Sequence, residues 1–196
     1  MEAAKSMPKR YSLEEYFRLA DASPTKLEFK RGEIVDMAGA SFNHNRIASH
    51  LNRLLGNRLL NGPCEVMISD QRVKTSSDWY CYPDLVIVCD DPQFDSKATV
   101  DTLENPSVII EVVSPTTESA DRGEKFFNYI RIPSLREYFL VAQDRARVDS
   151  FSRNQEGVWI VKPVVEGLDG ILTFQSLKLE IPMSEIYANV KFENRV

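Results

Sequence analysis

The stretch that decides the fold is Val108–Val113, VIIEVV, which is followed by Ser114-Pro115. Successive side chains of a β-strand point to opposite faces, so this segment presents apolar residues on both faces. Such a strand is typical of the centre of a sheet that is covered on both sides. Glu111 is the exception, because it shares a face with Ile109 and Val113. An unpaired carboxylate there would cost several kcal/mol, so Glu111 needs a cation, a hydrogen-bond network or a shifted pKa.

A second carboxylate has a related setting. Asp84 stands at the start of the apolar segment Leu85–Val88 and is expected on the face of Val86 and Val88. Two carboxylates that strands bring side by side form an oxygen site suited to a hard cation such as Mg²⁺ or Mn²⁺. Such an ion can generate a hydroxide nucleophile and stabilise a transferring phosphoryl group. The structural alternative is that Asp84 only caps a turn and Glu111 only forms a salt bridge.

The segment after the strand predicts a helix over roughly Thr117–Ile130. On this helix Asp121, Lys125 and Tyr129 are spaced i, i+4, i+8, so they share one face. An ammonium group that reached the metal site from this face would orient the attacking water or stabilise a pentavalent phosphorane. The alternative is a solvated Asp–Lys pair with the tyrosine packed below it.

The remaining segments predict a mixture of helices and strands. A capping box at Ser12–Glu15 begins a short helix, a hairpin turns at Arg31-Gly32, and an amphipathic helix extends from Asn43 to about Leu60. Further strands are expected at Glu65–Ser69, Gln71–Thr75, Tyr138–Ala142, Arg147–Arg153 and Val158–Val164, the last three as an antiparallel meander. No repeat or linker divides the chain. We therefore expect one α/β (α+β) domain over residues 1–196, with a mixed central sheet flanked by helices.

The composition limits the function classes. The chain has 196 residues, of which 43% are hydrophobic and 27% charged, and its net charge is −5. This balance counts against a protein that binds nucleic acid mainly through backbone charge, but a nuclease cleft that holds a divalent metal can be acidic. No apolar run reaches about 18 residues and the first residues lack an apolar core. We therefore expect no membrane span and no signal peptide.

The three cysteines, Cys64, Cys81 and Cys89, are an odd set without CxxC spacing. This pattern argues against a disulfide framework and against a structural zinc site. We expect free thiols in a reducing cytoplasm.

Two further polar residues receive a structural interpretation from the sequence. His44 and His50 are six residues apart, about 240° around a helix, so they are not paired metal ligands. His44 is expected to face inward as a hydrogen-bonded structural residue. Glu28 alternates away from Leu27 and Phe29 and, taken alone, is expected to be exposed on its hairpin. The chain contains no GxSxG, P-loop, dinucleotide or HExxH motif.

Three segments together resemble the Uma-two family of restriction endonuclease-like proteins: LEFKRGEIVDMAGAS…H, YPDLVIV and PSVIIEVVSPTTESADRGEKFFNYIRIPSLREYFLV. The resemblance extends from about Tyr11 to Phe151 and more weakly to the closing LEIP segment. The family is assigned to the PD-(D/E)XK nuclease fold, a mixed sheet flanked by helices with a metal-dependent phosphodiesterase site. The resemblance therefore implies a restriction endonuclease-like fold.

The resemblance also implies a site, position by position. Asp84 matches the aspartate of the PD motif and Glu111 matches the (D/E). Val113 stands where the general pattern has its lysine, and Lys125 is the position at which this family supplies the lysine from the following helix. The positions expected to border the site are Glu28, His44 and Asp121.

Three hypotheses follow. The resemblance implies a Mg²⁺- or Mn²⁺-dependent endonuclease acting on DNA, in which Asp84 and Glu111 hold the metal and Lys125 assists. We also expect the protein to be cytoplasmic and to form a homodimer. The second hypothesis is a non-catalytic module of nuclease fold that binds nucleic acid or protein, which the acidic charge and Val113 favour. The third is a metal-dependent hydrolase of another phosphodiester.

Overall fold

Strand β8 (Val108–Val113) lies inside the larger of two main sheets, as its two apolar faces predict. In the computed structural model, which describes residues 9–37, 39–115 and 117–192, this sheet has the order β11-β10-β9-β8-β6-β3, and β12 also pairs with β10. The other strands are Cys64–Ile68 (β3), Leu85–Cys89 (β6), Glu137–Ala142 (β9), Arg147–Arg153 (β10), Trp159–Val161 (β11) and Val165–Glu166 (β12). Because β8 is parallel to β9 and antiparallel to β6, the sheet is mixed, as expected.

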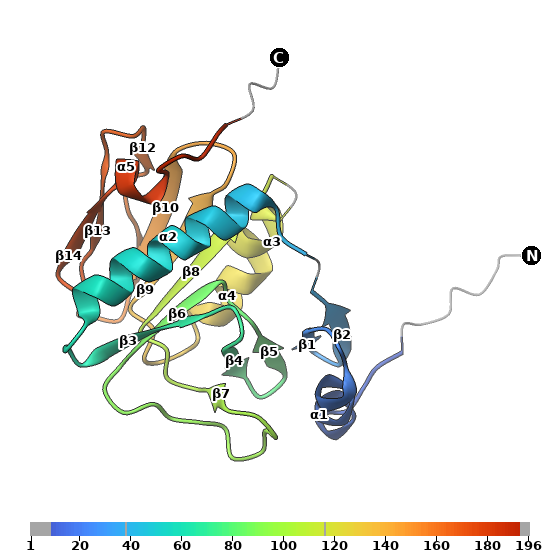
Figure 1. Cartoon of the computed structure of the whole chain (residues 1–196). Helices are drawn as coiled ribbons and strands as arrows, with labels where there is room; N and C mark the ends of the chain where they lie inside the picture. Colours follow the sequence, from blue (N-terminus) through green and yellow to red (C-terminus); the bar gives the residue numbers. More distant parts are fainter. Residues whose placement is uncertain (1–8, 38, 116, 193–196) are drawn as a thin grey trace, which may run out of the picture.

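A smaller sheet has the order β2-β1-β5-β4-β7. Its strands are Leu27–Lys30 (β1), Glu33–Asp36 (β2), Arg72–Ser76 (β4), Trp79–Cys81 (β5) and Thr102–Leu103 (β7). The predicted hairpin turn is confirmed, with Arg31 and Gly32 both at positive φ, 50° and 89°. Within the described residues, the pairing of β1 with β5 is the strand pairing that joins this hairpin to the rest of the sheet. In Figure 1 the hairpin and helix α1 (Leu13–Ala22), drawn in blue, lie beside the rest of the molecule.

The remaining elements cover the larger sheet. The helices are α2 (Phe42–Leu59), α3 (Glu118–Ala120), α4 (Phe126–Tyr129) and α5 (Met183–Ile186), with a π-helical turn η1 (Asp121–Lys125) between α3 and α4. Strands β13 (Ile171–Phe174) and β14 (Leu179–Pro182) form a separate hairpin. Within the described ranges, no helix has the length and apolar character needed to cross a bilayer. Residues 1–8, where the sequence predicts no signal peptide, lie outside these ranges.

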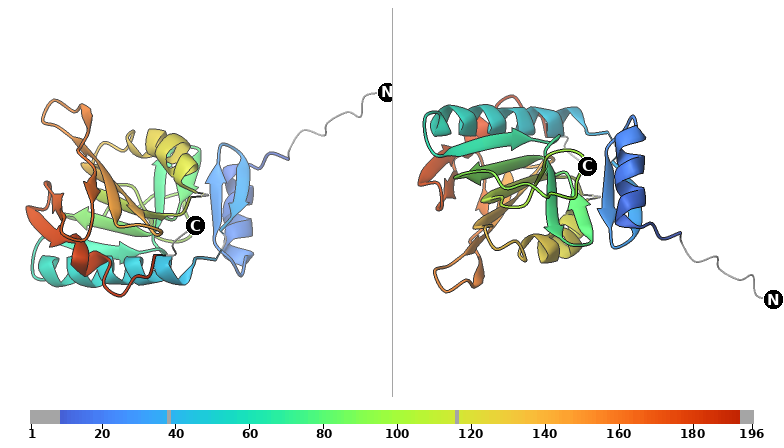
Figure 2. Two further views of the ribbon diagram at one scale, coloured as in Figure 1. Left: turned by 90° about the horizontal axis from the view of Figure 1, so that it is seen from above. Right: turned by 90° about the horizontal axis from the view of Figure 1, so that it is seen from below.

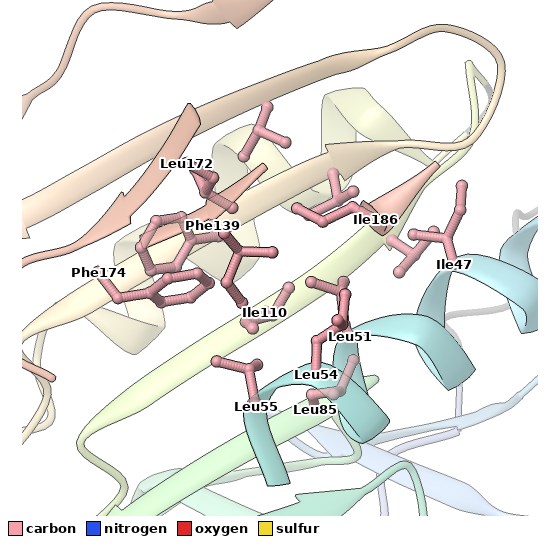
Figure 3. Close-up of a cluster of buried hydrophobic side chains, with 14 of the residues drawn as sticks. Ile47, Leu51, Leu54, Leu55, Leu85, Ile110, Phe139, Leu172, Phe174 and Ile186 are labelled. Carbon is pink, nitrogen blue, oxygen red and sulfur yellow. The ribbon is translucent and has the colours of Figure 1, made fainter. Parts of the chain in front are cut away.

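The core has two layers, one on each face of the larger sheet. On one face, the apolar stripe of α2 packs against β6, β8 and β9 together with side chains of β13 and α5 (Figure 3). On the other face, α4 and the preceding turn cover Ile109, Val113 and Tyr138. Each large side chain that is fully buried contributes about 1.5–3 kcal/mol of transfer free energy. Covering β8 on both sides is therefore what places Glu111 in an apolar environment.

The predicted elements differ from the structure mainly where they are short or irregular. The capping box is confirmed, because the Ser12 hydroxyl accepts from the Glu15 amide and the Glu15 carboxylate accepts from the Ser12 amide. The helix predicted over Thr117–Ile130 contains the π-helical turn, which no side-chain periodicity distinguishes. The two- and three-residue strands β5, β7 and β12 are too short to produce a readable alternation.

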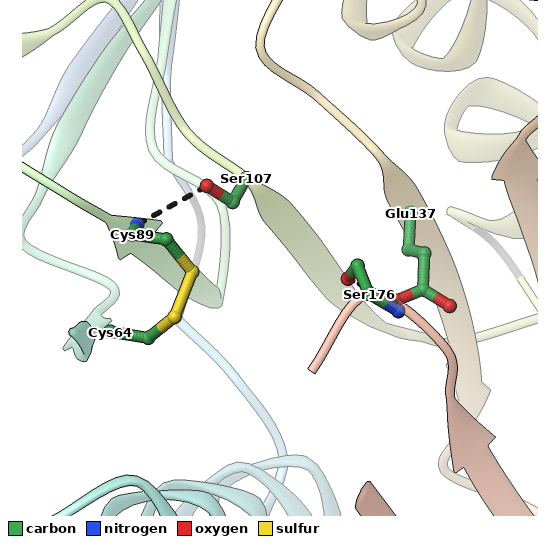
Figure 4. Close-up of a disulfide and its surroundings, with 5 residues drawn as sticks. All are labelled: Cys64, Cys89, Ser107, Glu137 and Ser176. Atoms are coloured by element: carbon green, nitrogen blue, oxygen red, sulfur yellow. Dashed lines mark hydrogen bonds between the residues drawn. A yellow bond between two sulfur atoms is a disulfide. The ribbon is translucent and has the colours of Figure 1, made fainter. Parts of the chain in front are cut away.

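The expectation of free thiols is wrong for two of the three cysteines. Cys64 and Cys89 form a disulfide (Figure 4), whereas Cys81 is a buried free thiol. The reason is tertiary: the pairing of β3 with β6 places Cys64 directly opposite Cys89, with their Cα atoms 4.0 Å apart. A separation of 25 residues carries no such signal in the sequence.

Candidate functional site

Glu111 lies in the interior between β8 and the helical segment that follows it. Its side chain is almost completely buried, with 3% of the residue exposed. Its Oε1 accepts a hydrogen bond from the Tyr129 hydroxyl at 2.7 Å and one from Lys125 Nζ at 3.0 Å. Among the described residues, none bonds to Oε2. The carboxylate is therefore fixed through one oxygen and retains a second for another partner.

The helical segment delivers a cation to this carboxylate. Lys125 Nζ lies 3.0 Å from both Glu111 Oε1 and Asp121 Oδ1, so one ammonium bridges a strand and a helix. Asp121 is itself buried, at 4% exposed, and its carbonyl accepts a hydrogen bond from the Tyr138 hydroxyl. The face shared by Asp121, Lys125 and Tyr129 thus points at β8. A solvated Asp–Lys pair is not what the structure contains.

Asp84 immediately precedes β6 and faces the same region of β8. In the β6–β8 register Leu85 is opposite Ile110, so continuing the pairing by one residue places Asp84 opposite Glu111. Asp84 Oδ2 accepts from the Val112 amide at 2.7 Å and lies 3.0 Å from His44 Nε2. No described residue bonds to Oδ1.

His44 approaches Asp84 from the first turn of α2. Because an ionised carboxylate can only accept, Nε2 carries the proton of this hydrogen bond. Nδ1 is buried and has no hydrogen-bond partner among the described residues. Helix α2 covers the face of β6 that Leu85 and Ile87 line, whereas Val86 and Val88 belong to the core layer on the opposite face.

The expectation that Glu28 is exposed on its hairpin is wrong. The residue is buried, with 4% of its surface exposed. Its Oε1 accepts from the Tyr82 amide at 3.2 Å, and its Oε2 forms a salt bridge with Lys30 Nζ at 2.8 Å. The burial arises because β1 pairs with β5. The charge of Glu28 contributes to raising the pKa of Lys125.

The site contains more carboxyl groups than cationic side chains, and their pKa values reflect this excess. Burial, together with the charges of Asp84 and Asp121, raises the pKa of Glu111 to about 8, against the attraction of Lys125 and the hydrogen bond from Tyr129. Burial alone would lower the pKa of Lys125, but Glu111, Asp121 and Glu28 together raise it well above its ordinary value. Burial alone would likewise lower the pKa of His44, but the hydrogen bond to Asp84 and the charges of Asp84 and Glu111 together raise it above its ordinary value. Lys125 is therefore a permanent cation, and the carboxylates around it still favour additional positive charge.

Two carboxylate oxygens, Asp84 Oδ1 and Glu111 Oε2, are the atoms that fit a divalent metal ion. They are hard oxygen donors, and Mg²⁺ is commonly held by one or two carboxylates with water completing its shell. Within residues 9–37, 39–115 and 117–192, no group of three or more His, Cys, Asp or Glu side chains is arranged to hold a metal. The described residues therefore form no all-protein metal cage, and an ion held here would take most of its ligands from water.

The structure brings together most of the residues that the sequence singled out. Glu111, Lys125 and Asp121 are in direct contact, and Asp84 is bonded to His44 beside them. The sequence missed that Tyr129 donates to Glu111, although its helical spacing from Lys125 placed it on the correct face. The structural alternatives are also partly realised, because Glu111 does form a salt bridge and Asp84 does bond to the main chain.

Comparisons with known proteins give one family model and two relatives of similar length. A family model described as "Uma2: Putative restriction endonuclease" matches residues 13–184. The uncharacterized protein sll1609 of Synechocystis sp. is 33% identical over 166 residues, covering 84% of this chain and 93% of the relative. A second uncharacterized Synechocystis protein, slr1290, is 33% identical over 184 residues, covering 93% of this chain and 94% of the relative.

A solved structure has the same fold. The crystal structure of a putative nuclease belonging to DUF820 from Anabaena variabilis matches with a TM-score of 0.74. The match covers 91% of this chain and 98% of that chain at 15% sequence identity. At this identity the similarity establishes the fold, a mixed α+β arrangement that the two structures share.

Proposed function

Because the chain belongs to the Uma2 family of restriction endonuclease-like proteins, we propose that it is a divalent-metal-dependent endonuclease that hydrolyses DNA phosphodiester bonds. The observation that carries the proposal is the contact between Lys125 Nζ and Glu111 Oε1 at 3.0 Å. Val113 occupies the position of the usual lysine, and a helix supplies the ammonium instead. The site therefore combines the two carboxylates and one lysine that the family's chemistry requires.

Each residue has a role that follows from its environment. Asp84 and Glu111 would hold Mg²⁺ or Mn²⁺, which when bound supplies an activated water and positive charge for the scissile phosphate. Lys125 stays protonated, since the surrounding carboxylates raise its pKa, so it acts as a fixed positive charge and not as a base. Tyr129 orients Glu111, and His44 orients Asp84. A cytoplasmic location belongs to the same proposal.

A plasmid-cleavage assay tests this function. Wild-type protein with Mg²⁺ or Mn²⁺ is expected to nick or linearise supercoiled plasmid, and EDTA should abolish the reaction. Glu111→Gln and Asp84→Asn should reduce cleavage to the level of a protein-free control while circular dichroism shows an unchanged fold. Glu124→Gln is the matched control, because Glu124 is exposed on the same turn as Lys125. Equal nicking by wild type and Glu111→Gln would contradict the proposal.

A second candidate function is a nuclease-fold module that does not cleave. The observations that favour it are Val113 at the position of the usual lysine and the net charge of −5. Calorimetric titration with Mg²⁺ and Mn²⁺ separates the two. Heat that disappears in Asp84→Asn and Glu111→Gln supports the enzyme, whereas the absence of carboxylate-dependent binding supports the module. Including a small phosphodiester in the cleavage assay tests hydrolysis of other substrates.

A further inference from the structure

The outer edge of the larger sheet, at β11, is unusually apolar for an exposed strand. Val158, Ile160 and Val161 are 56%, 40% and 72% exposed. In both views of Figure 2 the orange hairpin formed by β10 and β11 extends beyond the body of the molecule. Edge strands are normally protected by charges, proline or covering segments. Between Val158 and Val161 there is neither a charge nor a proline, and Lys162-Pro163 comes only afterwards.

The main chain of β11 has unused hydrogen-bonding groups on this edge. The Asn154 amide donates to the Val158 carbonyl, and the Lys162 amide donates to the Ser150 carbonyl. In an antiparallel pair the residues that bond to the neighbour alternate with residues that do not. Trp159 and Val161 therefore turn their amide and carbonyl groups away from β10. In the described part of the chain, no other group bonds to these main-chain atoms.

We propose that two copies of this chain pair through this edge, β11 against β11, antiparallel about a two-fold axis at Ile160. Trp159 would exchange main-chain hydrogen bonds with the partner's Val161, and the symmetry repeats the exchange with the roles reversed. The two copies of Ile160 would then face each other in a non-hydrogen-bonded pair. A two-fold contact requires a surface that is complementary to itself. Strand β11 meets this requirement, because its outward main-chain groups pair with those of an antiparallel copy.

The side chains support a second copy as the occupant. On one face, Trp159 would lie opposite the partner's Val161, an aromatic–β-branched pair of the kind that stabilises sheets. Trp159 is already positioned by Phe126, with ring centroids 6.2 Å apart. On the other face, Lys162 would lie opposite the partner's Val158, so no like charges meet. The inference does not rest on the proposed function, because none of these residues belongs to the candidate site.

Cysteine cross-linking tests the register. Ile160→Cys places two cysteines opposite each other at the axis, and mild oxidation should give a covalent dimer on a non-reducing gel. Val158→Cys is the matched control, because Val158 directly precedes β11 and lies on the same face as Ile160. Its two copies would be four residues out of register, about 13 Å apart, farther than a disulfide spans. The background is low because Cys64 and Cys89 are joined and Cys81 is buried. Equal cross-linking of both variants, or none, would overturn the pairing.

The oligomeric state gives an independent test. Light scattering with size-exclusion chromatography and sedimentation should find a wild-type dimer that dissociates on dilution. Ile160→Lys puts like charges at the axis and should weaken the dimer about tenfold or more. Val161→Pro removes an outward amide without touching a bond to β10, and should weaken it as well. A monomer at every concentration, or a dimer that neither variant affects, would contradict the proposal.

Discussion

Glu111 shows how one buried carboxylate connects stability with chemistry. Its charge is opposed by burial and by Asp84 and Asp121, and only Lys125 and Tyr129 compensate it directly. An ionised glutamate at position 111 makes the metal-free protein less stable than an apolar or neutral side chain at the same position would. Such a cost is common at functional sites, where activity and stability compete. The proposed cation would supply the missing positive charge.

The pH dependence of stability follows from this residue. The pKa of Glu111 is raised from its ordinary value of 4.5 to about 8, so between these values the folded protein keeps a proton that the unfolded chain releases. The free energy of unfolding should therefore fall as pH rises across this window, by at most about 1.4 kcal/mol per pH unit. In Glu111→Gln this contribution is absent, so in EDTA the variant should gain stability over wild type as pH rises to about 8.

Urea unfolding of both proteins in EDTA, at intervals between about pH 5 and pH 9, measures this difference. Comparing the two curves cancels most of the contribution of other titrating groups, including His44. Parallel curves would show that Glu111 does not carry the raised pKa.

At the scale of elements, strand pairing determines what the cysteines do. The disulfide joins β3, at the edge of the larger sheet, to β6. Asp84 directly precedes β6 in the chain. The cross-link closes a segment with a sequence separation of 25 residues and so restricts the unfolded chain. For a loop of this length the expected stabilisation is about 3 kcal/mol.

Reduction should therefore lower the free energy of unfolding of the wild type by about 3 kcal/mol. The variant carrying both Cys64→Ser and Cys89→Ser should start near the reduced value and not respond to reductant. Denaturant unfolding with and without a phosphine reductant checks both expectations. A wild type that is indifferent to reductant would mean that the two thiols are not joined in solution.

At the scale of the whole molecule, the smaller sheet contributes to the site through Glu28. This residue accepts the Tyr82 amide, two residues before Asp84, and its charge raises the pKa of Lys125. Glu28→Ala would leave that amide without its partner, which should cost about 1–3 kcal/mol. Glu33→Ala, on the exposed second strand of the same hairpin, should change stability by less than about 0.5 kcal/mol.

Thermal and urea unfolding of these two variants against wild type give the comparison. Because Glu28 touches the loop that presents Asp84, its replacement should also weaken any metal binding that depends on Asp84. Identical stability of Glu28→Ala and Glu33→Ala would show that the contact between hairpin and loop contributes nothing.

Much of this organisation follows from local patterns. The capping box at Ser12, the turn at Arg31-Gly32 and the long amphipathic helix each depend on a few neighbouring residues, so the sequence predicts them. The burial of Glu28, the Cys64–Cys89 bond and the hydrogen bond from Tyr129 were not predictable in this way. Each of them depends on pairing between segments that are remote in the chain.

The sequence by itself determined that β8 is a central strand carrying one carboxylate, and that Lys125 follows on a helical face with Asp121 and Tyr129. Both follow from the spacing at which side chains return to the same face of a strand or a helix, which short segments of sequence already fix. Only the tertiary structure decided that this face packs on β8 and brings Lys125 Nζ to 3.0 Å from Glu111 Oε1. The direction of a helix relative to a strand depends on which apolar surfaces become buried together, and that is a property of the whole core.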